Sequence, residues 1–551
     1  MRSIFKWGDL MKRLASVLAA AFAIILLFGC TANEQAGQET KKKAKETAGE
    51  QVLRLNNENE PTSFDPPIGF NNVSWQALNN LMEGLTRLGA DHEPEAASAE
   101  KWNISDDGKT YTFTIRDDAK WSNGDPLTAG DFEYAWKRLL DPKTGSSAAF
   151  LGYFIEGGEA FNSGKGAKDD VKVKAVDEKT LKVTLESPQQ SFLSIVANPA
   201  FFPVPQKVAE KNPKWHEEAA TFVGNGPFKL TEWKHDESFT MVKSDTYWDR
   251  DTVKLDKVIW AMVDDRNTDY QMFESNELDT AYVPAEMSEK LMGADEVKVF
   301  DQAGLYYYRF NVNKEPFQNE KIRKAFAMAV DQQEIVDYVT KNGEKPARGF
   351  VSPGIKGPNG KEFREEGGDL LKYDADEAKH LLEKGMKEEN YEKLPAVKLT
   401  YSTKPEHKKM AEAIQQKLKS TLGVDVKLAN MEWNTFLEEQ KALKFQFSQS
   451  SFLADYADPI NFLESFQTGN AMNRTGWSNS EYDELIKAAK NEADEEKRTE
   501  LLHQAEELLF EGMPIIPIHF YNQVHLEKEN VKGIVRHPVG YIELKWAEKT
   551  S

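Results

Sequence analysis

The chain has 551 residues, a formal net charge of -20 at pH 7 and a single cysteine. The acidic charge disfavours nucleic acid and anionic membrane surfaces as partners, and one cysteine excludes an intrachain disulfide or a cysteine-based zinc site. Aromatic residues make up 11% of the chain, too many for a disordered acidic protein. We therefore expect a large folded core in two or more domains, without nucleic acid as a partner.

Residues 1–29 have the composition of an export signal. Basic residues precede an apolar run at 14–28, which is too short to cross a bilayer comfortably, and Gly29 and Cys30 follow it. This arrangement resembles a bacterial lipoprotein signal, in which the cysteine becomes the lipidated first residue. The alternative reading is a transmembrane anchor with a free thiol. Translation could start at Met1 or Met11, because the second start also leaves a complete signal.

Residues 30–51 are polar and lack apolar periodicity, so we interpret them as a flexible tether. The folded part begins with a short strand at 52–55. A helix is predicted over 77–85, where leucines and a methionine recur on one face. From residue 109 onward, apolar and polar residues alternate as in a half-buried strand.

The stretch 121–132 combines turn signals with a helix start. Asn-Gly and Asp-Pro pairs favour turns, and Thr128 with Asp131 forms a pattern similar to a capping box. Aromatic and aliphatic residues then follow at helical spacing from Phe132. These features are structural, and they carry no chemistry of their own.

Together with Asp141-Pro142, this stretch resembles the signature of the extracellular solute-binding proteins that serve peptide and nickel ABC importers. The resemblance extends from about Leu53 to the C-terminus and points to the oligopeptide-binding branch. Further matches to that pattern lie at 60–66, 83–85, 224–228 and 247–248.

The resemblance implies an α/β protein with the two-lobed periplasmic-binding-protein-like fold, type II in its large variant, and a ligand cleft between the lobes. The first lobe would comprise 52–303 plus 523–551, with an extra subdomain at about 84–207, and the second lobe 304–522. We expect a monomer without metal or other cofactor.

The second half of the chain supports an α/β fold by its pattern. Alternating strands at 397–401 and 424–428 flank a helical stretch, which predicts a βαβ unit and a parallel sheet. Thr403 and Glu406 predict a capping box for that helix, and Gly423 its end. A single long helix is predicted over 321–339.

The stretch 452–459 is the main candidate for ligand binding. Its apolar run ends at Asp455, shortly before an Asp-Pro pair that should stop the strand. From these residues alone, a solvated turn aspartate is the favoured interpretation of Asp455, because aspartates are common in turns. In the oligopeptide-binding proteins that the chain resembles, an aspartate within a Trp-x-x-Asp motif pairs with the peptide's α-amino group. Here Phe452 takes the tryptophan position.

Main-chain pairing would hold the peptide between 70–72 and 451–453. Tyr307, His407, Trp433 and Tyr521 are further cleft candidates; from sequence alone, His407 could also be a surface residue and Trp433 a core residue. The full set of ligand-binding candidates is Phe70, Asn71, Asn72, Tyr307, His407, Trp433, Ser451, Phe452, Leu453, Asp455 and Tyr521.

The chain also departs from the pattern. Gln440 and Gln449 stand where some relatives carry arginines, which are thought to meet the carboxylate end of the peptide. Ala148 replaces a tyrosine. These differences leave open the ligand's length and how its C-terminus is held.

The resemblance implies a lipoprotein at the outer face of the cell membrane that captures short peptides and delivers them to the permease subunits of an ABC transporter. Alternatives are a binding protein for a dedicated signalling peptide, a murein peptide or a nickel complex. A cell-surface peptidase is disfavoured, because neither Gly-x-Ser-x-Gly nor His-Glu-x-x-His occurs. We therefore expect a binding protein without catalytic residues.

Overall fold

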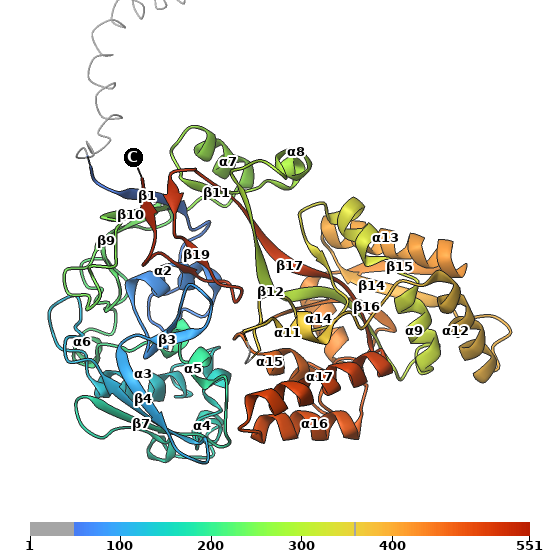
Figure 1. Cartoon of the computed structure of the whole chain (residues 1–551), viewed down its shortest axis with the longest axis horizontal. Coiled ribbons are helices and arrows are strands. Elements are labelled where there is room, and N and C mark those ends of the chain that lie inside the picture. Colours follow the sequence, from blue (N-terminus) through green and yellow to red (C-terminus); the bar gives the residue numbers. More distant parts are fainter. Residues whose placement is uncertain (1–48, 358–359, 551) are drawn as a thin grey trace, which may run out of the picture. The chain divides into compact units, whose positions relative to one another are not determined.

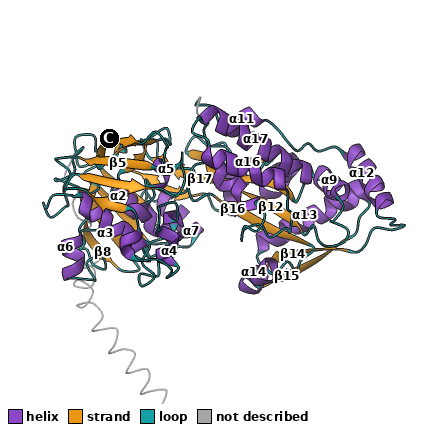
Figure 2. Cartoon of the chain, turned by 90° about the horizontal axis from the view of Figure 1, so that it is seen from below, coloured by secondary structure: helices purple, strands orange, loops and turns teal. Residues whose placement is uncertain are grey.

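The computed structural model describes residues 49–357 and 360–550. Cys30, the signal segment and most of the tether lie outside the described residues. From Gln51 onward the chain is a two-lobed α/β protein, with a separate β-sheet at the centre of each lobe (Figures 1 and 2).

The first lobe is built on a four-stranded mixed sheet. Its first strand, β1 (Val52–Asn56), pairs in parallel with β10 (Lys257–Ala261), and β9 (Ser238–Lys243) and β8 (Phe228–Lys234) continue the sheet in antiparallel pairing. The helix α2 (Asn72–Leu81) lies earlier than the predicted 77–85. Asn71 caps its start by accepting from the Ser74 amide, and the backbone is extended at Met82, which ends the helix before Leu85.

A subdomain with its own antiparallel sheet follows, in the order β4-β5-β7-β6. The helix α3 (Ala129–Leu139) packs against it, and the predicted capping box between Thr128 and Asp131 is confirmed. The strands are β2 (Thr86–Leu88), β3 (Pro94–Ala96), β4 (Ala99–Ile104), β5 (Thr110–Ile115), β6 (Val173–Ala175) and β7 (Thr180–Thr184), and the short helices are α4 (Gly158–Asn162), α5 (Phe192–Ile195) and α6 (Gln206–Lys211).

Residues from three of the further matches to the family pattern, at 83–85, 224–228 and 247–248, meet in one buried network around Glu83. Its carboxylate accepts from the Tyr247 hydroxyl at 2.5 Å, the Trp248 indole at 2.7 Å and the Arg87 guanidinium at 3.1 Å. The Asn225 side chain bonds to both the amide and the carbonyl of Glu83. A charge buried this deeply needs such partners, so these motifs stabilise the fold.

The larger sheet forms the centre of the second lobe and has the order β11-β17-β12-β16-β14-β15, with β13 (Lys345–Pro346) beside β17. Its edge strand β11 pairs with the last residues of β17, where that strand enters the first lobe. The predicted βαβ unit is confirmed, because β14 and β15 are parallel and α13 (Pro405–Leu422) joins them. The predicted capping box is wrong: Lys404 precedes the helix and no side chain caps it. The strands are β11 (Thr280–Tyr282), β12 (Val297–Phe310), β14 (Val397–Ser402), β15 (Val426–Met431), β16 (Phe447–Leu453) and β17 (Ile515–Glu527).

The single helix predicted over 321–339 is interrupted. The structure has α9 (Glu320–Met328), α10 (Gln332–Ile335) and a π-helical turn, Val336–Thr340. Asp331 causes the break, because its side chain accepts from the Gln333 and Glu334 amides and so caps a new helix.

The remaining helices cover the sheets and their edges. Near the C-terminus, α16 and α17 pack against each other as a hairpin. The bounds are α7 (Arg266–Glu274), α8 (Ser288–Leu291), α11 (Phe363–Gly367), α12 (Ala375–Glu388), α14 (Trp433–Lys441), α15 (Pro459–Leu463), α16 (Ser480–Asn491) and α17 (Glu495–Gly512). No helix within the described ranges is both long and apolar enough to cross a membrane.

Two long strands, β12 and β17, run side by side between the lobes (Figure 1). Their pairing register shifts between Asp301 and Leu305. After β17 the chain returns to the first lobe through short paired strands: β18 (Val531–Lys532) with β21 (Glu548–Lys549), and β19 (Val535–Arg536) with β20 (Ile542–Glu543).

Candidate functional site

A cavity of about 920 Å³ lies between the lobes, at the place where β12 and β17 pass from one to the other. The first lobe contributes the end of β1, the start of α2 and Arg266. The second contributes the polar faces of β12 and β17 and the start of α13. Cavities of this size at a domain boundary are the usual location of ligand sites.

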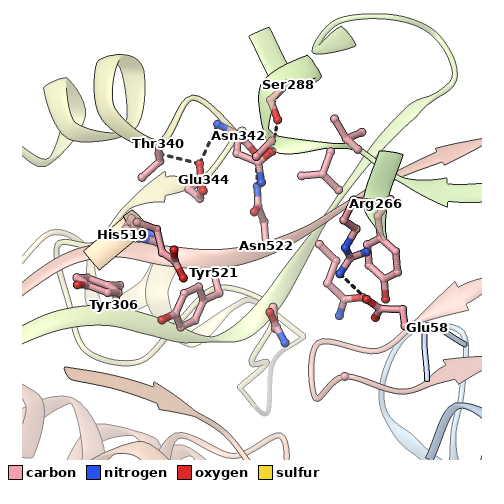
Figure 3. Close-up of a pocket in the computed structure, with 18 of the residues that line it drawn as sticks. Glu58, Arg266, Ser288, Tyr306, Thr340, Asn342, Glu344, His519, Tyr521 and Asn522 are labelled. Atoms are coloured by element: carbon pink, nitrogen blue, oxygen red, sulfur yellow. Dashed lines mark hydrogen bonds and ion pairs between the residues drawn. The ribbon is translucent and has the colours of Figure 1, made fainter. Parts of the chain in front are cut away.

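Aromatic rings form one wall of the cavity (Figure 3). Tyr306 stacks on His519, with ring centroids 5.5 Å apart and planes 6° apart, and His519 meets the edge of Tyr521 at 5.5 Å. His407 completes the wall, with its ring 5.8 Å from Tyr306 and Nδ1 2.7 Å from the Ser402 hydroxyl. Burial lowers the pKa of both histidines, so the wall is neutral at neutral pH.

Ionic and amide groups line the rest of the cavity (Figure 3). Arg266 pairs with Glu58 at 2.7 Å and lies over the Tyr282 ring. The Asn522 amide donates to the Asn342 carbonyl at 2.8 Å. The cavity therefore combines stacking surfaces with hydrogen-bonding groups, which suits a polar organic ligand.

Strand β16 has a free edge next to this region. Over its whole length it pairs with β12, but β14 pairs with it only at Phe447 and Ser448. From Ser450 to Leu453 the other edge has no strand partner among the described residues. Such an edge can accept an extended chain as an additional strand.

Asp455 lies two residues after the end of this strand. Its amide donates to the Asn461 side chain at 2.9 Å, but in the described part of the chain its carboxylate has no hydrogen-bond or ion-pair partner. Burial, together with the nearby negative charge of Glu464, raises the pKa of Asp455 to about 6. The ring of the neighbouring Tyr456 meets that of Phe154 of the first lobe edge to face, with centroids 6.3 Å apart, so Asp455 lies close to where the two lobes meet.

Five of the other predicted residues lie in the cavity or are exposed on β16. Asn72, His407 and Tyr521 line the cavity. Ser451 and Leu453 are exposed on β16, and the Ser451 hydroxyl interacts with that of Tyr521.

Three further predicted residues do not line the cavity. Phe452 is buried and packs on Phe350 and Phe462, with ring centroids 5.8 and 4.9 Å away. Phe70 meets the edge of Trp75, and Trp433 is exposed at the start of α14, where it stacks on Phe436.

The remaining two predicted residues also have local partners. The side chain of Asn71 caps α2, and Tyr307 is buried with its hydroxyl bonded to Arg309. Its neighbour Tyr306, which was not among the predicted residues, lines the cavity instead. The period-two alternation puts Tyr306 and Tyr307 on opposite faces, but it does not say which face meets the ligand.

Gln440 and Gln449 are both buried. The Gln440 amide donates to the Gln449 carbonyl at 3.0 Å and to the Ser448 hydroxyl at 3.2 Å, while its oxygen accepts from Arg474 at 3.2 Å. The Gln449 oxygen accepts from the Ser402 hydroxyl. Both glutamines are therefore engaged within the second lobe.

Two α/β lobes joined by paired strands, with a polar and aromatic cavity between them, define a solute-binding protein of the bilobal type. The family model for bacterial extracellular solute-binding proteins, family 5 middle, matches residues 93–474. The chain belongs to this family, whose members work outside the cytoplasm.

Similar proteins agree with this assignment. The dipeptide-binding protein DppE of Bacillus subtilis is 75% identical over 98% of this chain and 100% of its own length. The oligopeptide-binding protein OppA of the same species is 42% identical over 97% of this chain and 98% of its own. The family and these curated relatives are binding proteins.

Solved structures share the fold. The unliganded open form of MppA, a periplasmic murein tripeptide-binding protein, has a TM-score of 0.81 at 31% identity, covering 91% of this chain and 98% of its own. Listeria monocytogenes OppA bound to peptide has a TM-score of 0.71 at 33% identity, covering 91% of this chain and 100% of its own.

Proposed function

We propose that this protein captures short peptides between its lobes and delivers them to the permease of an ABC importer. The names of the similar proteins support the substrate class, because they include dipeptide-binding and oligopeptide-binding proteins. The ligand is bound and released intact, since the family is one of binding proteins.

The observation that carries this proposal is the half-buried Asp455 carboxylate, which has no cation paired with it among the described residues. A buried charge without a partner is unfavourable, and the raised pKa of Asp455 reflects that cost. Every unmodified peptide brings an α-ammonium group, which would supply the missing charge. A charge-assisted hydrogen bond there recognises the start of any peptide, whatever its side chains.

The free edge of β16 supplies the second element of recognition. A peptide with its ammonium at Asp455 would lie beside Ser451 and Leu453, whose side chains are exposed. Backbone hydrogen bonds along this edge give affinity without reading the sequence. The neutral aromatic wall around Tyr306 then offers stacking surface for varied side chains.

The lobes would close around the ligand. The higher TM-score against an unliganded open structure than against a peptide-bound one, 0.81 against 0.71, supports an open cleft in this structure. The register shift between Asp301 and Leu305 supports a lobe boundary near residue 303, and the lobes would then be 52–303 plus 523–551 and 304–522. We place the lipid anchor on Cys30, and the protein acts as a monomer.

Calorimetry with alanine peptides of three to five residues tests the proposal. We expect binding to the wild-type protein, and at least tenfold weaker binding when the peptides are N-acetylated, because acetylation removes the ammonium charge. Asp455→Asn should weaken the binding of the free peptides to a similar extent and leave the affinity for the acetylated peptides unchanged. Asp251→Asn, at an exposed position in the first lobe, is the matched control.

The proposal fails if neither the free nor the acetylated peptides bind to the wild-type protein. Equal binding of both forms would show that another group holds the peptide. In that case Asp455 would lose its assigned role, while peptide capture would stand.

A further inference from the structure

Two carboxylates that line the interlobe cavity have no cation paired with them. Glu344 accepts from the Thr340 hydroxyl at 2.8 Å and from the Asn342 amide at 3.1 Å, and both of these donors are neutral. Glu406, in the first turn of α13, has no hydrogen-bond or ion-pair partner for its carboxylate among the described residues. Both groups therefore bring an uncompensated negative charge to the cavity.

Three lysines that lie close to Glu344, in the chain or at the cavity, have other partners. These contacts are Lys341 with Glu289 at 3.1 Å, Lys345 with Asp301 at 2.8 Å, and Lys409 with the Val339 carbonyl. The other charged residues of the cavity lining, Arg266 and Glu58, neutralise each other. The cavity therefore has a negative balance of charge, which a cationic group of a ligand would offset.

Strand pairing places Glu344 beside the aromatic wall of the cavity. The strands β13 and β17 are antiparallel, with Pro346 opposite His519. Glu344 is two residues before Pro346, so this register brings it across from Tyr521. Residues directly opposite each other share one face of a sheet, and Glu344, His519 and Tyr521 all line the cavity (Figure 3). Burial lowers the pKa of His519, and the negative charge of Glu344 partly offsets this effect, as expected for neighbouring groups.

The cavity adjoins the edge that would hold the peptide. Tyr306 pairs with Ser451 across β12 and β16, and the Ser451 hydroxyl interacts with that of Tyr521. A peptide bound along the free edge from Ser450 to Leu453 would therefore pass beside the aromatic wall. Successive side chains of an extended chain point to opposite faces, so only some positions of the ligand can send a side chain into the cavity.

Resting on the proposed function, we propose that the cavity selects peptides with a basic side chain, whose cationic end pairs with Glu344. The aliphatic stem of a lysine or arginine side chain would pack on the rings of Tyr306 and Tyr521, and a cation near the face of such a ring gains further attraction. The charge-assisted hydrogen bond to Glu344 is stronger than a neutral one, and the charge of Glu406 adds to the attraction. This selection supplements backbone pairing, which does not read the side chains of the peptide.

The experiment is calorimetry on the full-length protein in detergent, with tetraalanine and with variants of it that carry one lysine at position 2, 3 or 4. Each lysine peptide is compared with the peptide that has norleucine at the same position, because norleucine keeps the aliphatic stem and lacks the ammonium group. We expect at least one position at which the lysine peptide binds the wild-type protein at least tenfold more tightly than the norleucine peptide.

Glu344→Gln should remove this difference, because the amide oxygen can still accept from Thr340 and Asn342 but carries no charge. Glu344→Asp should recover part of the difference. Glu412→Gln is the matched control and should keep all of it, because Glu412 is an exposed carboxylate of the same lobe that does not line the cavity. Thermal melting of each variant checks that the fold is intact.

Equal binding of the lysine and norleucine peptides to the wild-type protein at every position overturns the inference and leaves peptide capture intact. An equal loss of affinity for both peptides in Glu344→Gln also overturns it, because Glu344 would then act on the fold and not on the ligand's charge. If neither tetraalanine nor any other peptide of the series binds to the wild-type protein, the proposed function itself fails.

Discussion

Arg498 donates from one nitrogen to both carboxylate oxygens of Asp458, at 2.8 and 2.9 Å. Both side chains are buried, and Asp458 also caps α15 by accepting from the Ile460 amide at 2.8 Å. The pair ties the loop that carries Asp455 to α17. The Asp-Pro turn after β16 therefore has its position set from two sides, by a helix cap and by an ion pair.

We predict that Arg498→Ala lowers the free energy of unfolding by about 3 to 5 kcal/mol, because it leaves Asp458 buried without its cation. Urea denaturation measures this loss. The control is Arg348→Ala, which removes an exposed pair with Asp369 and should cost less than about 1 kcal/mol. If both variants lose the same amount, the buried pair does not hold the loop.

Asp455 should destabilise the unliganded protein at neutral pH. Its pKa is about 6 in the folded protein and 3.8 in the unperturbed state. The folded state therefore binds this proton more tightly. The proton on Asp455 therefore stabilises the folded state. This stabilisation is complete below pH 3.8 and is lost as the pH rises through 6.

Asp455→Asn cannot ionise, so the variant should be more stable than the wild type at pH 7.5, by at most about 3 kcal/mol at about 1.4 kcal/mol per pKa unit. The difference should shrink toward pH 4. Denaturation curves at both pH values check it. A variant that is less stable than the wild type at pH 7.5 would contradict an unpaired buried carboxylate.

Local features of the sequence predicted much of the fold. The capping box at Thr128, the βαβ unit and the end of β16 before Asp458 all depend on residues close in sequence. The break at Asp331 was missed, because an aspartate inside an apolar helical pattern can either face solvent or cap a new helix.

The site was less predictable because it depends on contacts that are distant in sequence. Glu83 meets Asn225 and Tyr247 only after the first lobe has folded, so its motif could be recognised but not explained. The pairing of Arg474 with Gln440 likewise requires the loop after α15 to fold back toward α14. The spacing of residues in one sequence does not predict contacts between segments that are so far apart along the chain.

Peptide affinity should depend on pH through Asp455. The ligand's ammonium needs the ionised carboxylate, and a proton competes for it below the pKa of about 6. We predict that the dissociation constant for a free alanine peptide rises by about one log unit per pH unit below pH 6, since one proton is taken up on release. Calorimetry from pH 4.5 to 7.5 measures the profile. Asp455→Asn is the control and should bind weakly with a flat profile; the same slope in this variant would assign the dependence to another group.

Main-chain pairing with β16 should be visible in modified ligands. If the free edge from Ser450 to Leu453 bonds to the peptide backbone, methylating a peptide nitrogen that donates to it removes one hydrogen bond and inserts a methyl group into the ladder. A series of tetraalanines, each methylated at one amide, should contain at least one member whose affinity drops tenfold or more. The unmodified peptide and a member whose amide faces away from β16 serve as references, because strand geometry alternates the direction of successive N–H groups. If every member binds as tightly as the unmodified peptide, strand addition is wrong and side-chain contacts must hold the ligand.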